Sequence, residues 1–321
     1  MPSDDRGAHS NVRSAMKPSE RFAYVPIVDR KKLRLADRKR VIVWPLVSVE
    51  EWDVAKQMPR TQSVPPGGLV VLPDIQNWGW HEYGMRVGIW RLLETFDKYG
   101  IKPTLTLNAK VCETRPRLAH ALLDAGWEFA AHGYEQMHIS KVQDQREMMR
   151  HSVEVLKKFT GRRPAGWLGP GRGQTFATMD HIADAGFRWF SDWVMDDLPF
   201  WAETLYGPIL SLPYTAELND VPVMVGAQHE SDVMLKRTRD IYKTLHRDAE
   251  SADSVRIMAF GVHPFVSGAS HRIGYFDEML RFLRDKDDVT FMKGEQIYDW
   301  YSAQVAPGNG ATGQSPEIST L

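Results

Sequence analysis

The chain has 321 residues, and its 40 Lys and Arg against 41 Asp and Glu give a formal net charge of −1. This balance, with no polybasic patch, argues against nucleic acid and membrane surfaces as partners. The single cysteine, Cys112, excludes an internal disulfide framework and a cysteine-rich zinc module.

The hydrophobic fraction of 43% is that of a globular protein, and no apolar run approaches the roughly 18 residues of a membrane helix. The first residues lack the apolar segment of a secretory signal. We therefore expect a cytoplasmic enzyme that acts on a small-molecule substrate.

Short apolar runs alternate with amphipathic segments along the chain. The runs predict buried strands at 40–49, 102–108, 127–132, 165–169, 187–192 and 255–263. The amphipathic segments, several of which end at a glycine, predict helices at 86–99, 117–125, 143–159, 175–185, 232–246 and 275–283. This alternation predicts an α/β fold with a parallel sheet, more specifically a closed or distorted (β/α) barrel.

No linker interrupts the alternation, so we expect one catalytic domain over residues 39–303. An arm (1–38) precedes it, and a small, polar, Gly- and Pro-containing tail (304–321) follows it.

Acids and histidines stand where predicted strands end, which is where a βα barrel carries its active site. Glu50 and Glu51 follow the first strand, and His132 and His263 end two later ones. Taken alone, the two glutamates are explained equally well by a solvated loop, and a single histidine is more often a hydrogen-bonded structural residue than a catalyst. Their joint placement predicts a catalytic group.

Other residues near strand ends are candidates for substrate binding, although turns, caps and core packing explain each of them singly. Asp196, Tyr214 and Asn219 are expected to hydrogen-bond the amide groups of a substrate. Trp80 and Trp193, expected in loops, would pack against its ring. The full set is Trp80, Arg172, Trp193, Asp196, Tyr214 and Asn219.

Several of these motifs resemble those of the NodB-homology polysaccharide deacetylases. The run 126–133 (GWEFAAHG) is similar to their histidine motif, and 165–171 (AGWLGPG) to their Arg/Pro/Gly segment. The allantoinase-like branch, with its cofactor-independent allantoinases and cyclic-imide hydrolases, is more similar still. The features shared with that branch are Glu50–Glu51, 82–86 (EYGMR), His132–Gly133, 191–201 (SDWVMDDLPFW) and 212–220 (LPYTAELND).

The resemblance runs from about Lys39 to Tyr301. It implies a distorted (β/α)7 barrel of the NodB-homology type, hydrolysis of an amide, and assembly into a homo-oligomer.

The chain departs from the metal-dependent deacetylases of this family at two points. Their second histidine, four positions after the first, is replaced by Gln136, and their arginine aligns with Leu168 or Gly169. The resemblance therefore implies that no metal cofactor is needed. The alternative is a zinc or other divalent cation held by Glu51, His132 and His138.

These observations favour a hydrolase that opens a small cyclic amide, such as a hydantoin or an imide. Glu50 or Glu51 would activate water, and His132 and His263 would act as the acid and the oxyanion stabiliser. Because side chains alternate along a strand, only one glutamate should face the site. Glu50 is favoured, because it aligns with the family's catalytic base.

Two other functions remain open. One is a metal-dependent N-deacetylase that acts on a glycan or another N-acyl substrate. The other is a non-catalytic, degenerate barrel that serves as a binding module.

Overall fold

The computed structural model describes residues 16–308. Its single sheet has the strand order β6-β7-β5-β4-β3-β2-β1-β8, and β9 pairs with the first residues of β1. All pairs are parallel except β6 with β7. The strands are β1 (Val41–Val49), β2 (Thr104–Leu107), β3 (Glu128–Ala131), β4 (Gly166–Trp167), β5 (Trp189–Phe190), β6 (Phe200–Ala202), β7 (Ile209–Ser211), β8 (Arg256–Val262) and β9 (Val289–Phe291).

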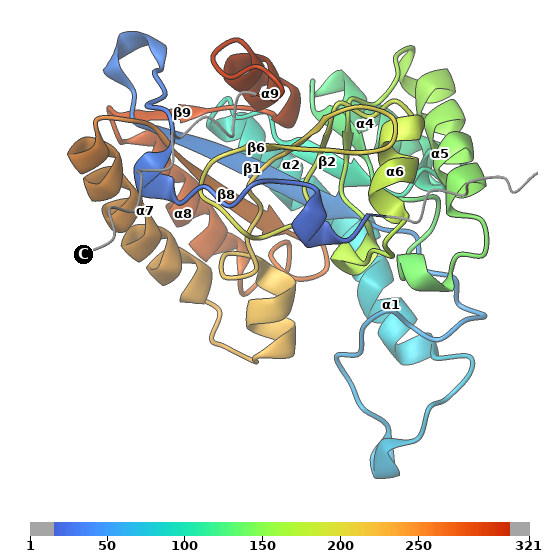
Figure 1. Ribbon diagram of the computed structural model, residues 1–321. Coiled ribbons are helices and arrows are strands. Elements are labelled where there is room, and N and C mark those ends of the chain that lie inside the picture. Colours follow the sequence, from blue (N-terminus) through green and yellow to red (C-terminus); the bar gives the residue numbers. More distant parts are fainter. Residues whose placement is uncertain (1–15, 309–321) are drawn as a thin grey trace, which may run out of the picture.

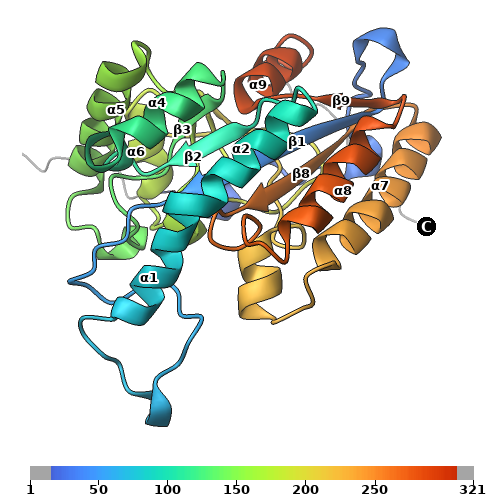
Figure 2. The same ribbon diagram turned by 180° about the vertical axis from the view of Figure 1, so that it is seen from behind.

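Helices α1 to α8 lie between strands along the chain, and α9 follows β9. Figure 2 shows α2, α7 and α8 lying across one face of the curled sheet, and Figure 1 shows the N-terminal segment on the other side. The helices are α1 (Ile75–Tyr83), α2 (Ile89–Lys98), α3 (Val111–Thr114), α4 (Pro116–Asp124), α5 (Gln145–Thr160), α6 (Thr178–Asp184), α7 (Val233–Ala252), α8 (Ile273–Arg284) and α9 (Gly294–Ser302).

Each predicted strand run contains an observed strand, and each predicted helix overlaps an observed one. The alternating α/β architecture predicted from the sequence is thus confirmed. The sequence did not predict α1, α3, α9 or the short strands β6, β7 and β9. The expectation that Trp80 lies in a loop is wrong, because Trp80 belongs to α1. Asp74 caps the start of this helix by accepting a hydrogen bond from the Asn77 amide.

Strand β1 is buried along its whole length and divides two hydrophobic cores. Val43 and Val47 pack in one core with Phe96 of α2. Trp44 and its even-numbered neighbours pack in the other core, inside the curl of the sheet. Side chains of β1 therefore alternate between the helical layer and the interior, as the period of a strand requires.

The N-terminal segment is anchored on the barrel by a buried ion pair. The Arg21 guanidinium donates to both carboxylate oxygens of Asp180 in α6, at 3.0 and 2.8 Å. It also donates to the Phe176 and Glu203 carbonyls. Arg21 therefore fastens the N-terminal segment to α6 and to the residue after β6.

We expect Asp180→Asn to lower the free energy of unfolding by about 3–5 kcal/mol at neutral pH, because it leaves the Arg21 guanidinium buried without its counter-charge. Urea unfolding measures this loss. Burial works against the ionisation of Asp180, but hydrogen bonds from Arg21 and the Leu205 amide, with the charge of Arg21, lower its pKa from the ordinary 3.8.

The sign of the pH dependence follows from that lowered pKa. The stabilisation is fully present above the unfolded pKa and is lost as pH falls through the folded one. The gap between wild type and variant should therefore close below about pH 3.8. Arg150→Ala, which removes an exposed ion pair with Glu147, is the control and should change stability by less than about 1 kcal/mol. Equal urea midpoints for wild type and Asp180→Asn would contradict the anchor.

Candidate functional site

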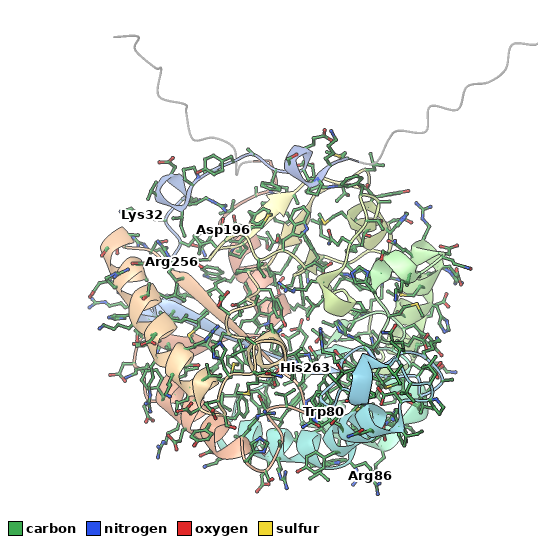
Figure 3. All side chains as sticks on the ribbon, turned by 90° about the horizontal axis from the view of Figure 1, so that it is seen from below. Lys32, Trp80, Arg86, Asp196, Arg256 and His263 are labelled. Atoms are coloured by element: carbon green, nitrogen blue, oxygen red, sulfur yellow. The ribbon has the colours of Figure 1, made fainter. Side chains whose placement is uncertain are left out.

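A cavity of about 530 Å³ opens where β1, β3, β4 and β8 end. Its volume lies within the range of small-molecule sites. Figure 3 shows His263, one of its lining residues, near the centre of the molecule. Its polar lining consists of Ser48, Glu50, Arg60, Thr61, His132, Arg172, Tyr214, Asn219 and His263.

Glu50 reaches the cavity because it continues the interior side of β1 past the end of the strand. Ser48, two residues earlier, lines the same cavity. The Glu50 carboxylate is 2% exposed. Its Oε2 accepts a hydrogen bond from Trp52 Nε1 at 2.6 Å, and its Oε1 accepts one from Gln136 Nε2 at 2.9 Å. Both donors hold the carboxylate in one orientation.

His263 is oriented by a buried carboxylate. Its Nδ1 lies 2.6 Å from Asp220 Oδ1, and its Nε2 lies 3.7 Å from Glu50 Oε1. The other oxygen of Asp220 accepts from the His263 amide and from the Ser267 hydroxyl, each at 2.7 Å. An ionised carboxylate only accepts hydrogen bonds, so Nδ1 of His263 carries a proton and Nε2 faces Glu50.

His132 has the same tautomer for a different reason. Its Nδ1 is hydrogen-bonded to the Leu168 carbonyl, which can only accept. Its Nε2 therefore points into the site and lies 3.9 Å from Glu50 Oε1. Burial lowers the pKa of His132, although the negative charge of Glu50 and the Leu168 hydrogen bond oppose that shift. The imidazole is thus neutral at pH 7.

The loop that carries His263 rests on a close backbone approach. The turn of π-helix Gly84–Gly88 joins α1 to α2. A Cβ atom at Gly88 would lie 2.0 Å from the Pro264 carbonyl oxygen, and one at Gly84 would lie 2.5 Å from the Phe265 nitrogen. Only glycine at these two positions lets the helix support the residues that follow His263.

Glu51 points to the opposite side of the strand. Its carboxylate forms an ion pair with Arg115, which also pairs with Glu82, and it accepts a hydrogen bond from the Thr114 hydroxyl. Its amide donates to Asn108 Oδ1 at 2.8 Å. Glu51 therefore joins the end of β1 to α3 and α4, outside the cavity.

The residues proposed as an alternative metal site do not converge. Glu51 faces away from His132, and His138 Nδ1 bonds Ser140 at the surface. Between residues 16 and 308, no group of three or more His, Cys, Asp or Glu side chains is arranged to hold a metal ion. Gln136, at the position of the family's second histidine, instead supplies an amide to Glu50. This donor set does not fit a resident zinc.

Of the predicted substrate-binding residues, Arg172, Tyr214 and Asn219 line the cavity. Asn219 Nδ2 donates to the Tyr214 hydroxyl oxygen at 2.6 Å. This leaves the hydroxyl hydrogen of Tyr214 available, and burial raises the pKa of this phenol, so it stays protonated.

Trp80, Trp193 and Asp196 are not among the lining residues. Trp80 packs behind Glu50, edge-on to Trp52 with ring centroids 6.2 Å apart. Trp193 packs on Phe22 and Phe190, and its indole donates to Gln174.

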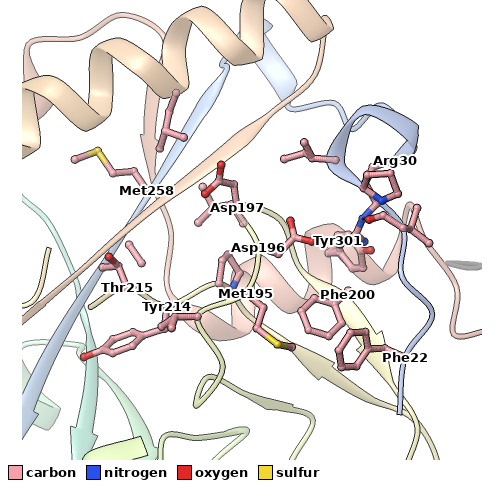
Figure 4. Close-up of a pocket in the computed structure, with 18 of the residues that line it drawn as sticks. Phe22, Arg30, Met195, Asp196, Asp197, Phe200, Tyr214, Thr215, Met258 and Tyr301 are labelled. Atoms are coloured by element: carbon pink, nitrogen blue, oxygen red, sulfur yellow. Dashed lines mark hydrogen bonds and ion pairs between the residues drawn. The ribbon is translucent and has the colours of Figure 1, made fainter. Parts of the chain in front are cut away.

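Asp196 belongs to a second, larger cavity of about 1100 Å³ beneath the N-terminal segment (Figure 4). There it forms an ion pair with Arg30, close to Phe22 and Phe200. Figure 3 likewise places Asp196 beside the N-terminal segment. Tyr214 lines both cavities.

The structure adds functional candidates that the sequence did not single out. Asp220 and Trp52 hold His263 and Glu50. Asn108 ties the ends of β1 and β3 together by accepting from the Glu51 amide and donating to the His132 carbonyl. Asp220 lies within the 212–220 segment, so the resemblance contained a signal for it; nothing in the sequence revealed its contact with His263.

Parts of the chain are similar to known proteins. Residues 81–190 match the family model described as polysaccharide deacetylase. A Schizosaccharomyces pombe protein whose name places it among the polysaccharide deacetylases is 26% identical over 242 residues, 70% of this chain and 75% of its own length. A peptidoglycan deacetylase of Helicobacter pylori is 31% identical over 105 residues, 32% of this chain and 36% of its own length.

The chain is thus similar in sequence to polysaccharide deacetylases. Among solved structures, the Puue allantoinase superposes with a TM-score of 0.77 at 22% identity, covering 84% of this chain and 93% of that one. A polysaccharide deacetylase-type protein of Pseudomonas aeruginosa PAO1 superposes with a TM-score of 0.75 at 23% sequence identity, and the match covers 83% of this chain and 92% of that one. At this identity the likeness shows the fold, and it confirms the distorted barrel. The matched family model and both relatives are named for deacetylation, which is the hydrolysis of a carbon–nitrogen bond other than a peptide bond.

None of the helices within residues 16–308 is both long and apolar enough to cross a membrane.

We expect His132 to stay neutral, with the proton on Nδ1, at pH values where a free imidazole titrates near 6.5. Nitrogen chemical shifts of labelled protein measure both tautomer and pKa, and His132→Gln assigns the resonance. The shift also predicts that acidification through pH 6.5 costs stability, since the unfolded chain binds that proton more readily. A proton on Nε2 would show that the Leu168 hydrogen bond is misassigned, and a pKa at or above 6.5 would show that burial does not dominate the environment of His132.

Proposed function

We propose that the protein hydrolyses the C–N bond of a small cyclic amide, a hydantoin- or imide-like ring, without a metal. The observation that carries this proposal is the convergence of Glu50 Oε1 with Nε2 of His132 and of His263, at 3.9 and 3.7 Å. These groups supply a base, a second acceptor and an acid on one side of a cavity of small-molecule size.

Glu50 and His132 are suited to hold the attacking water. Glu50 Oε1 and the unprotonated His132 Nε2 are both acceptors, so a water between them donates one hydrogen to each. Glu50 takes a proton as the water oxygen adds to the ring carbonyl. The hydroxyl hydrogen of Tyr214 can donate to the developing oxyanion.

His263 is suited to complete the reaction. When the C–N bond breaks, the electron pair goes to the ring nitrogen, and a protonated His263 Nε2 gives that nitrogen its proton. Asp220 stabilises the imidazolium and fixes its orientation. The proton held by Glu50 can then return to His263 across 3.7 Å, which leaves both groups ready for the next cycle.

The chemistry of the substrate fits a site of this kind. An ordinary amide has a poor leaving nitrogen, whereas the nitrogen of a hydantoin or an imide leaves more easily because it is flanked by carbonyl groups. Acid–base catalysis and an oxyanion donor are then sufficient in principle. The fold shared with the Puue allantoinase is consistent with this substrate class.

The second candidate is a metal-dependent N-deacetylase for a glycan or another N-acyl substrate. It is favoured by the match to the polysaccharide deacetylase model and by the names of the relatives. The position of Glu51 and the amide of Gln136 are arguments against it. A non-catalytic binding module would leave the alignment of Asp220, His263 and Glu50 without a purpose.

Homo-oligomeric assembly remains a proposal that rests on the allantoinase-like resemblance. Light scattering at micromolar concentration tests it, and a monomer mass would refute it.

We expect Glu50→Gln to reduce kcat by about 10²–10⁴-fold on a cyclic amide, with a modest change in KM, because it removes the base from the chemical step. Glu51→Gln is the matched control, since it makes the same change at the adjacent residue. It should retain turnover and lose some stability, because Arg115 loses a charged partner. Near-normal turnover in both variants would move the base elsewhere, with His132 the next candidate.

We also expect turnover to survive prolonged treatment with a chelator, because the donor set does not fit a resident metal. Rates before and after treatment, on cyclic amides and on an N-acetylated sugar, measure this. Loss of turnover that zinc or another divalent ion restores would reject the metal-free mechanism and favour the N-deacetylase.

A further inference from the structure

The candidate site contains an excess of positive charge that its mechanism does not use. Arg60 and Arg172 both line the cavity, whereas Glu50 is its only lining carboxylate. Within residues 16–308, neither guanidinium forms an ion pair or a side-chain hydrogen bond. By contrast, Arg21 and Arg115, at other buried or half-buried positions, are paired with acids.

Glu50 forms no ion pair with Arg60 or Arg172 within residues 16–308, and its single negative charge could offset only one of the two guanidinium groups. The positive charge of Arg60 also reaches the catalytic group, since it is one of the influences that lower the pKa of His132. An anion in the cavity could therefore pair with both guanidinium groups without displacing any interaction of Glu50.

Arg172 is held in a demanding conformation to reach this position. It ends the turn Pro170–Arg172 with φ of 57°, a left-handed backbone that L residues other than Asn and Asp rarely adopt. Asp192 anchors the turn from behind by accepting hydrogen bonds from the Gly169 amide and from Gln174 Nε2. Residues held in sparsely populated conformations cluster at functional sites.

Arg60 comes from a different part of the chain. It lies with Pro59 and Thr61 at the base of the long loop between β1 and α1, which projects from the body in Figures 1 and 2. Loops that follow β1 and β4 thus bring one guanidinium each to the same cavity.

We propose that Arg60 and Arg172 form a carboxylate-binding subsite, so that the preferred substrate is a cyclic amide that carries a carboxylate on its ring. This inference rests on the proposed function and names its substrate class. The planar guanidinium matches the two oxygens of a carboxylate, and such charge-assisted bonds are the stronger kind. With one side of the ring fixed in this way, its carbonyl would be presented to the water at Glu50.

The test compares two rings that differ only in charge, hydantoin-5-acetate and hydantoin-5-acetamide. Their binding to full-length Glu50→Gln protein is measured by calorimetry, since this variant lacks the base and leaves the ring intact. We expect the acetate to bind about 10- to 100-fold more tightly than the acetamide. Adding Arg60→Gln or Arg172→Gln should remove most of this preference, and rising salt should weaken it.

Two further variants serve as controls. Arg247→Gln removes an exposed arginine on α7 and should keep the full preference. Arg60→Lys keeps the positive charge but loses the planar guanidinium that can bind both carboxylate oxygens, and should keep only part of the preference. Equal affinity for the two rings, or a preference that persists in both arginine variants, would overturn the subsite, as would no binding of either ring.

Turnover by the protein with Glu50 intact separates this inference from the proposed function. If both rings are opened equally well, ring opening stands and the subsite is wrong. If neither is opened but the arginine-dependent preference for the acetate persists, the subsite stands and the reaction is wrong. If Arg60→Gln slows the acetamide ring as much as the acetate ring, the arginines act on the ring itself and the carboxylate assignment is overturned.

Discussion

The site depends on one constraint, the burial of β1 on both faces. Because helices cover one face and the interior of the curl fills the other, every side chain of this strand is committed to one side. The alternation continues past Val49 and sends Glu50 and Glu51 to opposite environments. One carboxylate therefore enters the cavity, and the other becomes a structural ion pair with Arg115.

Buried charge in the site is balanced by donors rather than by a counter-ion. Glu50 receives an indole and an amide donor, and Asp220 accepts from the His263 imidazole, the His263 amide and Ser267. Buried polar groups that lack such partners are costly, so these hydrogen bonds satisfy both carboxylates. They also fix geometry, since each imidazole has its Nδ1 engaged and turns Nε2 toward Glu50.

The same fold accommodates different chemistry through small changes at the strand ends. The chain shares its barrel with structures named for deacetylation and for allantoin hydrolysis. Here Gln136 stands where the deacetylase motif has its second histidine, and its amide donates a hydrogen bond to Glu50. The fold thus locates the site, while the residues at the strand ends decide the reaction. Arg60 and Arg172, which also line the cavity, come from the loops that follow β1 and β4.

Much of the architecture followed from local pattern. Apolar runs and glycine-ended helices predicted the βα alternation, because both signals lie within a few residues of each other along the chain. The positions of Glu50, His132 and His263 at strand ends were equally local, and parallel strands bring such ends to one edge. The alternation of side chains along a strand also predicted that only one of Glu50 and Glu51 faces the site.

Other features depended on contacts between distant segments. Asp220 meets His263 across 43 positions, and Gln136 meets Glu50 across 86. The expectation that Trp80 and Trp193 wall the ring was based on their neighbours in sequence, whereas helix α1 and the N-terminal segment provide their packing partners. The sequence by itself determined which residues could do chemistry and near which strand ends they lie. Only the tertiary structure decided which of them meet, because register, helix packing and the burial of each charge are properties of the whole chain.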